Sequence, residues 1–358
     1  MKNLFYIFLI IVLTGASVYT QTKKSAKTKA VFLENISWTE AEKVLKPETV
    51  VVIALGAQAK EPGPHLPLAA DFIQAEYIKN RIAERSDVVI APTINYGYYP
   101  AFTEYQGSTT LRLSVTREMI MDVCRSFMRF GVRRFYIINI GISTKVPLEQ
   151  AANLLKAEGV ILQYTDLDKT AESVVKEVKK EEKGTHADEI ETSIMLYIAP
   201  ASVDMKKAPK DYGVQKTVGA FTRNPQATRG IYVPTGVFGN ATLATREKGK
   251  KIVEAMVGDI AKQIEDVRLG ELPEAELFDE NIIGQYEIAP NDMITIARED
   301  NFLTAERKGI PKATMLPLGK YKFGVFRAEA TFFTNAQGKI THMIFSLSGQ
   351  DFLGRKIK

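Results

Sequence analysis

The chain has 358 residues, 45% of them hydrophobic and 25% charged, with a formal net charge of +5. This is an ordinary composition for a folded protein and enough length for two domains. The positive charge is modest and no Lys/Arg cluster is interleaved with aromatic residues, so nucleic acid is excluded as an expected partner.

The N-terminus has the pattern of a secretory signal peptide. Lys2 is followed by the apolar run "LFYIFLIIVL" and then by the small residues of "TGASVYTQ", which predicts a signal peptide over residues 1–21 and export to the periplasm or beyond. The alternative is an N-terminal anchor that is retained. The apolar run is shorter than the roughly 20 residues that span a bilayer, so we expect no membrane span after signal removal.

From about residue 34 to residue 270, apolar strand-like runs alternate with helical patterns. Strands are predicted over 49–55, 87–92, 133–139 and 160–166, and helices over 71–85, 117–131, 147–159, 186–200 and 244–269. This alternation predicts an α/β three-layer sandwich with a largely parallel sheet. Asp71 is placed to cap the first of these helices. The only cysteine, Cys124, falls inside a helical pattern and is expected to be a small buried hydrophobe, which leaves no intrachain disulfide and no cysteine-based zinc site.

The last eighty or so residues have a different pattern. An acidic, turn-prone linker precedes short strand-like pieces separated by turns such as "PND" and "NAQGK". We place a domain boundary near residue 275 and predict a small antiparallel all-β domain over residues 276–358.

Two clusters of polar residues are candidates for chemistry. The first is "KEPGPHLPLAAD", residues 60–71, a turn-rich loop after the first long strand, in which Glu61, His65 and Asp71 are possible ligands or acid/base groups. The alternative interpretation is that Asp71 only caps the following helix and that His65 hydrogen-bonds to the backbone. The loop "NIGIST", residues 139–144, follows another strand and is expected to lie close by.

The second cluster is "HADEIETS", residues 186–193. A histidine at a helix start with carboxylates nearby, here His186 and Glu191, is suited to general acid/base work near neutral pH. The alternative is a capping region, with Thr185 as N-cap and acidic residues complementing the helix dipole.

Histidine is scarce in this chain. The three are His65, His186 and His342, and the last lies among apolar residues where an ordinary strand residue is expected. A two-metal hydrolytic centre needs several histidine and carboxylate ligands, so this count argues against one. No nucleophile elbow, P-loop or dinucleotide-binding fingerprint is present.

Four blocks taken together resemble the creatininase (creatinine amidohydrolase) family. They are "LGAQAKEPGPHLPLAAD", "PTINYGYYPAFTEYQGSTTL", "FGVRRFYIINIG" and "HADEIETSIMLYIAP", in that order, within roughly residues 45–200. The resemblance implies an α/β sandwich, a homo-oligomer, and a two-metal centre that hydrolyses a cyclic amide or a similar C–N bond of a small molecule. The C-terminal segment resembles the small β domains appended to some exported serine hydrolases.

The resemblance also implies which residues would form the site. The family's first loop usually reads E-Q-H-G-P-H-L-P followed by an aspartate, so Asp71 corresponds to the carboxylate that bridges the metals. The ligand glutamate falls on Lys60, with Glu61 adjacent, and the ligand histidine falls on Pro62.

In the family's second loop, the ligand histidine becomes Gly141 and the glutamate position becomes Ser143, while Asn139 matches. His186 matches the catalytic histidine, and "ETS" from Glu191 matches the family's E-T-S.

Two hypotheses follow from this mixture. The first is an exported creatininase-type hydrolase with an altered site, in which His186, Glu191 and Glu61 are catalytic and Asp71 and Glu61 hold at most one weakly bound zinc or manganese ion, or none. The second is a non-catalytic relative that binds a small molecule, glycan or protein in the same pocket, made less polar by Ile140 and Ile142. A structural role of the C-terminal domain is a third possibility.

Overall fold

The computed structural model describes residues 30–275, 278–299, 302–325, 328–347 and 349–357. The predicted signal peptide, residues 1–21, lies outside these ranges. Within them, no helix has both the length and the apolar composition needed to cross a membrane.

A five-stranded parallel sheet forms the centre of the first domain. Its order is β1-β3-β2-β4-β5. The strands are Val31–Phe32 (β1), Val50–Leu55 (β2), Val89–Ile94 (β3), Arg134–Asn139 (β4) and Ile161–Tyr164 (β5). Every residue of β2 is buried, as expected of a central strand covered on both faces.

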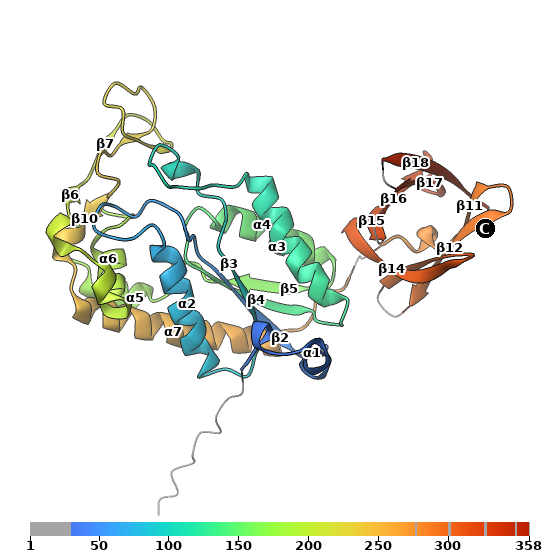
Figure 1. The fold of residues 1–358 in the computed structure, drawn as a ribbon, viewed down its shortest axis with the longest axis horizontal. Coiled ribbons are helices and arrows are strands. Elements are labelled where there is room, and N and C mark those ends of the chain that lie inside the picture. The colour runs from blue at the N-terminus through green and yellow to red at the C-terminus, as the bar shows by residue number, and fades with distance from the viewer. Residues whose placement is uncertain (1–29, 276–277, 300–301, 326–327, 348, 358) are drawn as a thin grey trace, which may run out of the picture.

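Helices cover both faces of the sheet, as Figure 1 shows. Alternate residues of β2 point to opposite faces, so that Val52 packs with one core and Ile53 with the other. The first core includes residues of α2 (Ala70–Ala83), α5 (Glu172–Val178), α6 (Glu189–Ile198) and α7 (Arg246–Leu269). The second includes residues of α3 (Leu113–Met128) and α4 (Lys145–Ala157), with α1 (Trp38–Val44) beside them. The predicted three-layer α/β fold is confirmed.

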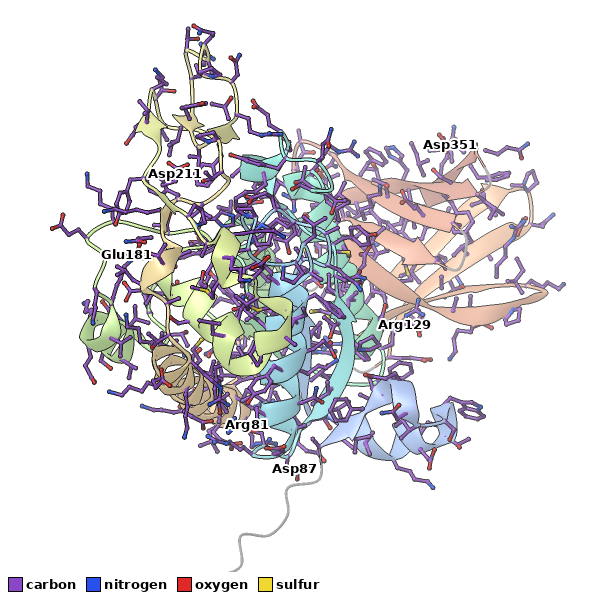
Figure 2. All side chains as sticks on the ribbon, turned by 60° about the vertical axis from the view of Figure 1, so that its left-hand side comes forward. Arg81, Asp87, Arg129, Glu181, Asp211 and Asp351 are labelled. Carbon is purple, nitrogen blue, oxygen red and sulfur yellow. The ribbon has the colours of Figure 1, made fainter. Side chains whose placement is uncertain are left out.

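Between α6 and α7 the chain forms short strands instead of a further layer. These are Lys210–Asp211 (β6), Val214–Gln215 (β7), Phe221–Thr222 (β8), Ile231–Tyr232 (β9) and Gly239–Asn240 (β10). β7, β8 and β9 form an arm that rises above the rest of the domain in Figure 1. Asp211 lies at the base of this arm (Figure 2), where its carboxylate accepts hydrogen bonds from Thr235 Oγ1 at 2.7 Å and Gly213 N at 2.8 Å.

The C-terminal strands close into an antiparallel barrel, β11 to β18, in which β11 also pairs with β18. Its interior is an apolar core that includes Tyr286, Phe323 and Phe332. The strands are Gly284–Ala289, Asp292–Glu299, Phe302–Arg307, Ile310–Gly319, Lys322–Val325, Ala328–Thr334, Ile340–Leu347 and Gln350–Lys356. The predicted all-β class of this segment is confirmed, whereas the boundary near residue 275 stays a prediction.

Two local predictions were wrong. Asp71 does not cap α2, because the N-cap position is Ala69 and Asp71 lies inside the first turn. Thr185 does not cap α6, because Asp188 is the N-cap and its carboxylate accepts from the backbone N–H groups of Ile190 and Glu191. Cys124 is fully buried in α3, as predicted.

Candidate functional site

The loops that follow β2 and β4 meet the start of α6 around a small pocket of about 130 Å³, called here the strand-end pocket. Its walls combine charged groups with aromatic and aliphatic side chains. The lining residues are Lys60, Tyr99, Phe102, Ile140, Gly141, Ile142, Ser143, Thr185, His186, Glu191 and Phe221. Parallel strands place their carboxyl ends at one edge of the sheet, which is why two of these loops converge.

One side of the pocket is an ion pair between Lys60 and Asp71. Lys60 Nζ lies 2.7 Å from Asp71 Oδ2, and the side chains are only 6% and 4% exposed. Burial acts to lower the pKa of Lys60, but the surrounding carboxylates, Asp71 foremost, raise it above its ordinary value. The ammonium is therefore charged at neutral pH. It also lies 5.0 Å from the centroid of the Phe102 ring, within the range of a cation–π contact.

The other side of the pocket is His186, which Glu61 holds from behind. His186 Nε2 lies 3.0 Å from the carbonyl oxygen of Glu61 and 3.1 Å from its carboxylate Oε2. Both partners are acceptors, so Nε2 carries the proton and Nδ1 is free to accept one. The Glu61 carboxylate also accepts from Gly63 N. A Cβ at Gly236 would lie 2.1 Å from Glu61 Oε1, so this glycine allows the close approach.

Glu191 lies between the two sides. Its Oε2 accepts from Ala187 N at 2.6 Å and lies 3.7 Å from His186 Nδ1. Burial raises the pKa of the Glu191 carboxyl, while His186 and Lys60 act to lower it. Ala187 itself has a left-handed backbone with φ of 49°, a conformation that costs a non-glycine residue free energy and that occurs often at functional sites.

His65 does not face the strand-end pocket. It is 2% exposed, and its Nε2 forms a hydrogen bond with Thr192 Oγ1 at 2.8 Å. Burial, together with the nearby His186, lowers the pKa of His65 to about 4. His65 is therefore neutral at pH 7 and ties the first loop to α6. The alternative that the His65 side chain hydrogen-bonds to the backbone of its loop is wrong, because its partner is the Thr192 side chain.

The loop after β4 leaves no room for a side chain at position 141. A Cβ there would lie 2.7 Å from Thr144 Oγ1 and 3.2 Å from Tyr99 Cε1. Thr144 Oγ1 donates to Asn139 Oδ1 and the Gly141 carbonyl, and it is completely buried. Ile142 is 51% exposed at the edge of the pocket.

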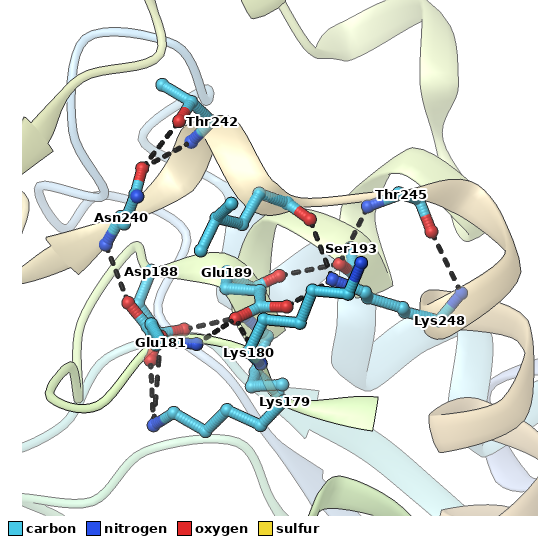
Figure 3. Close-up of polar contacts among 12 residues, drawn as sticks. Lys179, Lys180, Glu181, Asp188, Glu189, Ser193, Asn240, Thr242, Thr245 and Lys248 are labelled. Atoms are coloured by element: carbon cyan, nitrogen blue, oxygen red, sulfur yellow. Dashed lines mark hydrogen bonds and ion pairs between the residues drawn. The ribbon is translucent and has the colours of Figure 1, made fainter. Parts of the chain in front are cut away.

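A buried polar network fixes the start of α6 and therefore the position of His186 (Figure 3). Glu189 Oε2 accepts from the backbone N–H groups of Lys180 and Glu181, both at 2.8 Å, and its Oε1 pairs with Lys248 on α7. Ser193 Oγ donates to the Glu189 carbonyl at 2.6 Å and accepts from Thr245 N at 3.1 Å.

A second carboxylate in this network, Glu181, is fully buried. Its Oε2 accepts from Asn240 N at 2.6 Å, and Lys179 Nζ lies 3.7 Å from its Oε1. Burial, with a hydrogen bond to the neighbouring Asp188 carboxyl, raises the pKa of Glu181 to about 8.

The structure thus brings Glu61, Asp71, His186 and Glu191 into one region, but only two of them line the pocket. His186 and Glu191 line the pocket, whereas Glu61 stands behind His186 and Asp71 stands behind Lys60. His342 lies on β17 in the barrel, stacked on Phe333 with ring centroids 4.8 Å apart.

Sequence reasoning missed Lys60 as a component of the site. It also missed the aromatic walls Tyr99, Phe102 and Phe221. A lysine five residues after a buried strand and eleven residues before an aspartate in the first turn of a helix was the available signal.

The α/β domain is similar to proteins of a known family. The family model described as creatininase, creatinine amidohydrolase, matches residues 34–264. Creatinine amidohydrolase of Pseudomonas putida is 26% identical over 263 residues, which cover 67% of this chain and 98% of the relative. Mycofactocin precursor peptide peptidase of Mycobacterium tuberculosis (strain H37Rv) is 25% identical over 227 residues, which cover 60% of this chain and 84% of the relative.

Solved structures agree on the fold. A crystal structure of creatinine amidohydrolase superposes with a TM-score of 0.55 at 22% identity, covering 69% of this chain and all of the other. A putative creatinine amidohydrolase from Bacteroides fragilis gives a TM-score of 0.53 at 21% identity, covering 68% of this chain and 98% of the other. Among these neighbours, one creatininase is described as a zinc–zinc type and another as a manganese form.

Proposed function

Because this chain belongs to the creatininase family, we propose that it is an amidohydrolase-like protein. Its strand-end pocket takes a small molecule with an amide or related C–N bond. The Lys60 ammonium supplies the positive charge of the site in place of a metal ion. The observation that carries this proposal is the buried Lys60–Asp71 ion pair beside the hydrogen-bonded pair of His186 and Glu61.

The donor set does not fit a zinc or manganese centre. Asp71, the carboxylate that the resemblance assigns to the metals, is paired at 2.7 Å with an ammonium group that would repel a cation. Pro62 has no donor atom, and at Gly141 Thr144 and Tyr99 fill the space a side chain would need. In the described part of the chain, no group of three or more His, Cys, Asp and Glu side chains is arranged to hold a metal ion.

The pocket supports hydrolysis that uses only protein groups. A substrate carbonyl oxygen beside Lys60 Nζ would be polarised by the ammonium, which then faces the negative oxygen as a water oxygen bonds to the carbonyl carbon. His186 Nδ1 would accept the proton of that water and return it to the leaving nitrogen as the C–N bond breaks. Glu61 is a positioning residue in this scheme, because it fixes the ring and the tautomer of His186.

The second candidate function is binding of the same class of molecule without turnover. It is favoured by the aliphatic side of the pocket, where Ile140 and Ile142 stand beside Gly141 with no acid or base of their own. In this case Lys60 would only anchor a carbonyl or carboxylate oxygen.

The decisive experiment measures metal content and turnover on one preparation. We expect less than about 0.1 zinc or manganese per chain, and hydrolysis of small lactams that chelator does not reduce. His186→Ala should abolish turnover, while the matched control His342→Ala in the barrel should leave it unchanged. Stoichiometric tightly bound metal would refute the proposal. Binding of lactams without turnover would refute hydrolysis in favour of the second candidate.

We also propose that the protein is exported, to the periplasm or beyond, and forms a homo-oligomer. The signal-like pattern of residues 1–21 supports the first and the family resemblance supports the second. Cell fractionation with N-terminal sequencing of the mature chain tests the first, and light scattering tests the second. A chain that begins at Met1 in the cytoplasm, or a monomer, would contradict them.

A further inference from the structure

A second chamber of about 260 Å³ lies next to the strand-end pocket. The two cavities adjoin at Ile140, Ile142, Thr185 and Glu191, each of which lines both of them. The second chamber is the larger by a factor of two, and its volume equals that of about nine molecules of liquid water. A molecule bound at Lys60 and His186 therefore has space beyond Glu191.

The second chamber has an apolar side, while Asp168, Lys179, Asp188 and Glu191 make other parts of its lining charged. Five aliphatic or thioether side chains of α5, α6 and α7 line it, together with Leu167 from the loop after β5: they are Val175, Ile190, Ile194, Ile252 and Met256. This apolar side gains free energy by covering CH₂ groups, so it is suited to an aliphatic chain.

One polar group in the lining has no partner. Gln74, on α2, is 4% exposed and lines the chamber, and its amide takes part in no hydrogen bond among the described residues. The amide is therefore available to a ligand in the chamber, and a group placed against it that can both donate and accept would form paired hydrogen bonds with it. Thr170, also 4% exposed, adds a hydroxyl oxygen without a partner to the same lining.

Gln74 is also correctly placed for a molecule that spans both cavities. It lies three residues after Asp71 on α2, so the two side chains share one face of that helix. Asp71 backs the ammonium of Lys60 in the strand-end pocket, while Gln74 lines the second chamber. One turn of α2 therefore connects the two cavities.

We propose that the site is bipartite and that its ligand is an aliphatic amide with a second polar group: the first amide lies at Lys60 and His186, the chain occupies the second chamber, and a terminal amide-like group pairs with Gln74. This proposal rests on the proposed function for the first amide only. The second chamber is defined by its own residues.

The experiment uses the mature full-length protein and two NMR reporters. The ε-methyl of Met256 reports on the second chamber and the ring of His186 reports on the strand-end pocket, assigned with Met256→Leu and His186→Ala. The probes are acetamide, hexanamide and hexanediamide. We expect acetamide to shift only His186, and the two longer amides to shift both signals with at least about tenfold higher affinity. Hexanediamide should bind at least threefold tighter than hexanamide, and Gln74→Leu should remove that difference.

Val175→Phe tests the chamber by filling it, with Val174→Phe on the same helix as the matched control, since Val174 packs in the core and does not line the chamber. Filling should abolish the Met256 response and reduce the affinity for hexanamide to that for acetamide. The bipartite site is overturned if no amide shifts Met256, or if Val175→Phe has no more effect than its control. A His186 response without a Met256 response refutes the second chamber alone. A Met256 response without a His186 response refutes the proposed function and keeps the chamber.

Discussion

The two walls of the strand-end pocket relate differently to the family pattern. The α6 wall carries the residues that the resemblance predicts, from His186 to Ser193. The wall built by the loops after β2 and β4 instead carries Lys60 and Gly141, with Pro62 in the same loop as Lys60, at the positions where the resemblance implies metal ligands. The same pocket therefore combines a matching half with a substituted half.

This difference shows that a residue can match the family pattern without taking part in the chemistry of the pocket. On the α6 wall, Ser193 and Glu189 bond to each other and to the start of α7, so the fold alone requires them. On the substituted wall, the replacements form a balanced set, because Lys60 neutralises Asp71 and Thr144 fills the space beside Gly141. Substitution here has produced a stable arrangement in which no buried charge is isolated.

The largest effect is expected from breaking the ion pair on the substituted wall. Lys60→Met leaves the Asp71 carboxylate buried and unpaired, which should lower the free energy of unfolding by about 3–5 kcal/mol. The double variant Lys60→Met/Asp71→Leu should recover most of that loss. Lys251→Met, which removes an exposed pair with Glu177, is the control and should cost no more than ~1 kcal/mol. Denaturant unfolding measures all three, and equal losses for Lys60→Met and its control would contradict a buried ion pair.

A smaller loss is expected on the α6 wall. Ser193→Ala removes the hydroxyl that joins the Glu189 carbonyl to Thr245 N and leaves that N–H without a partner, at a cost of about 1–3 kcal/mol. Ser202→Ala is the control: this serine is half-buried and its hydroxyl bonds only within its own short turn, so the variant should stay within ~1 kcal/mol of the unchanged protein. If the two variants unfold at the same denaturant concentration, the network of Figure 3 does not fix α6.

The third prediction concerns the pH dependence of stability that arises from Glu181, in the polar network at the start of α6. Glu181 has a folded-state pKa of about 8 and an ordinary value of 4.5, so between these values the folded protein holds one proton more than the unfolded chain. Stability should therefore fall as the pH rises from 4.5 to 8, with a loss on the order of 1 kcal/mol between pH 6.5 and 8. Glu181→Gln should flatten that part of the profile, as measured by denaturant unfolding at each pH. A profile that is unchanged in the variant would place the protonation elsewhere.

The sequence predicted the layers of the fold because they depend on long apolar patterns. The runs at 49–55 and 133–139 are typical of buried strands, and the 24 residues of α7 carry one unbroken helical pattern. The helices α1 and α5, seven residues each, and the two-residue strands β6 to β10 were not predicted, because such short elements are stabilised by tertiary contacts more than by their own pattern.

The sequence predicted which residues lie in the site but not which of them contact each other. His186 and Glu191 were identified from their spacing, and both line the pocket. Asp71 is predicted either as a metal ligand or as the cap of the following helix, whereas in the structure it forms an ion pair with Lys60. Gln74 gave one signal that was not used: it is a polar residue among the buried residues of α2, a set that also includes Asp71 and Lys79.

The smallest effect is expected at Ala187, where the two walls meet. Glycine adopts the left-handed conformation without the Cβ penalty, which is about 1 kcal/mol, but it also gains freedom in the unfolded chain. Ala187→Gly should therefore change the free energy of unfolding by less than ~1 kcal/mol. Ala171→Gly is the matched control, since Ala171 is also left-handed, with φ of 57°, and does not line the strand-end pocket.

We expect the two variants, Ala187→Gly and Ala171→Gly, to differ in their affinity for a ligand of the strand-end pocket. If the left-handed residue aims His186 and Glu191 into the pocket, Ala187→Gly should weaken acetamide binding severalfold through the added backbone freedom, and Ala171→Gly should not. Equal affinities in both variants would mean that the hydrogen bond from Ala187 N to Glu191 is sufficient to hold this corner, and that the backbone conformation serves the fold alone.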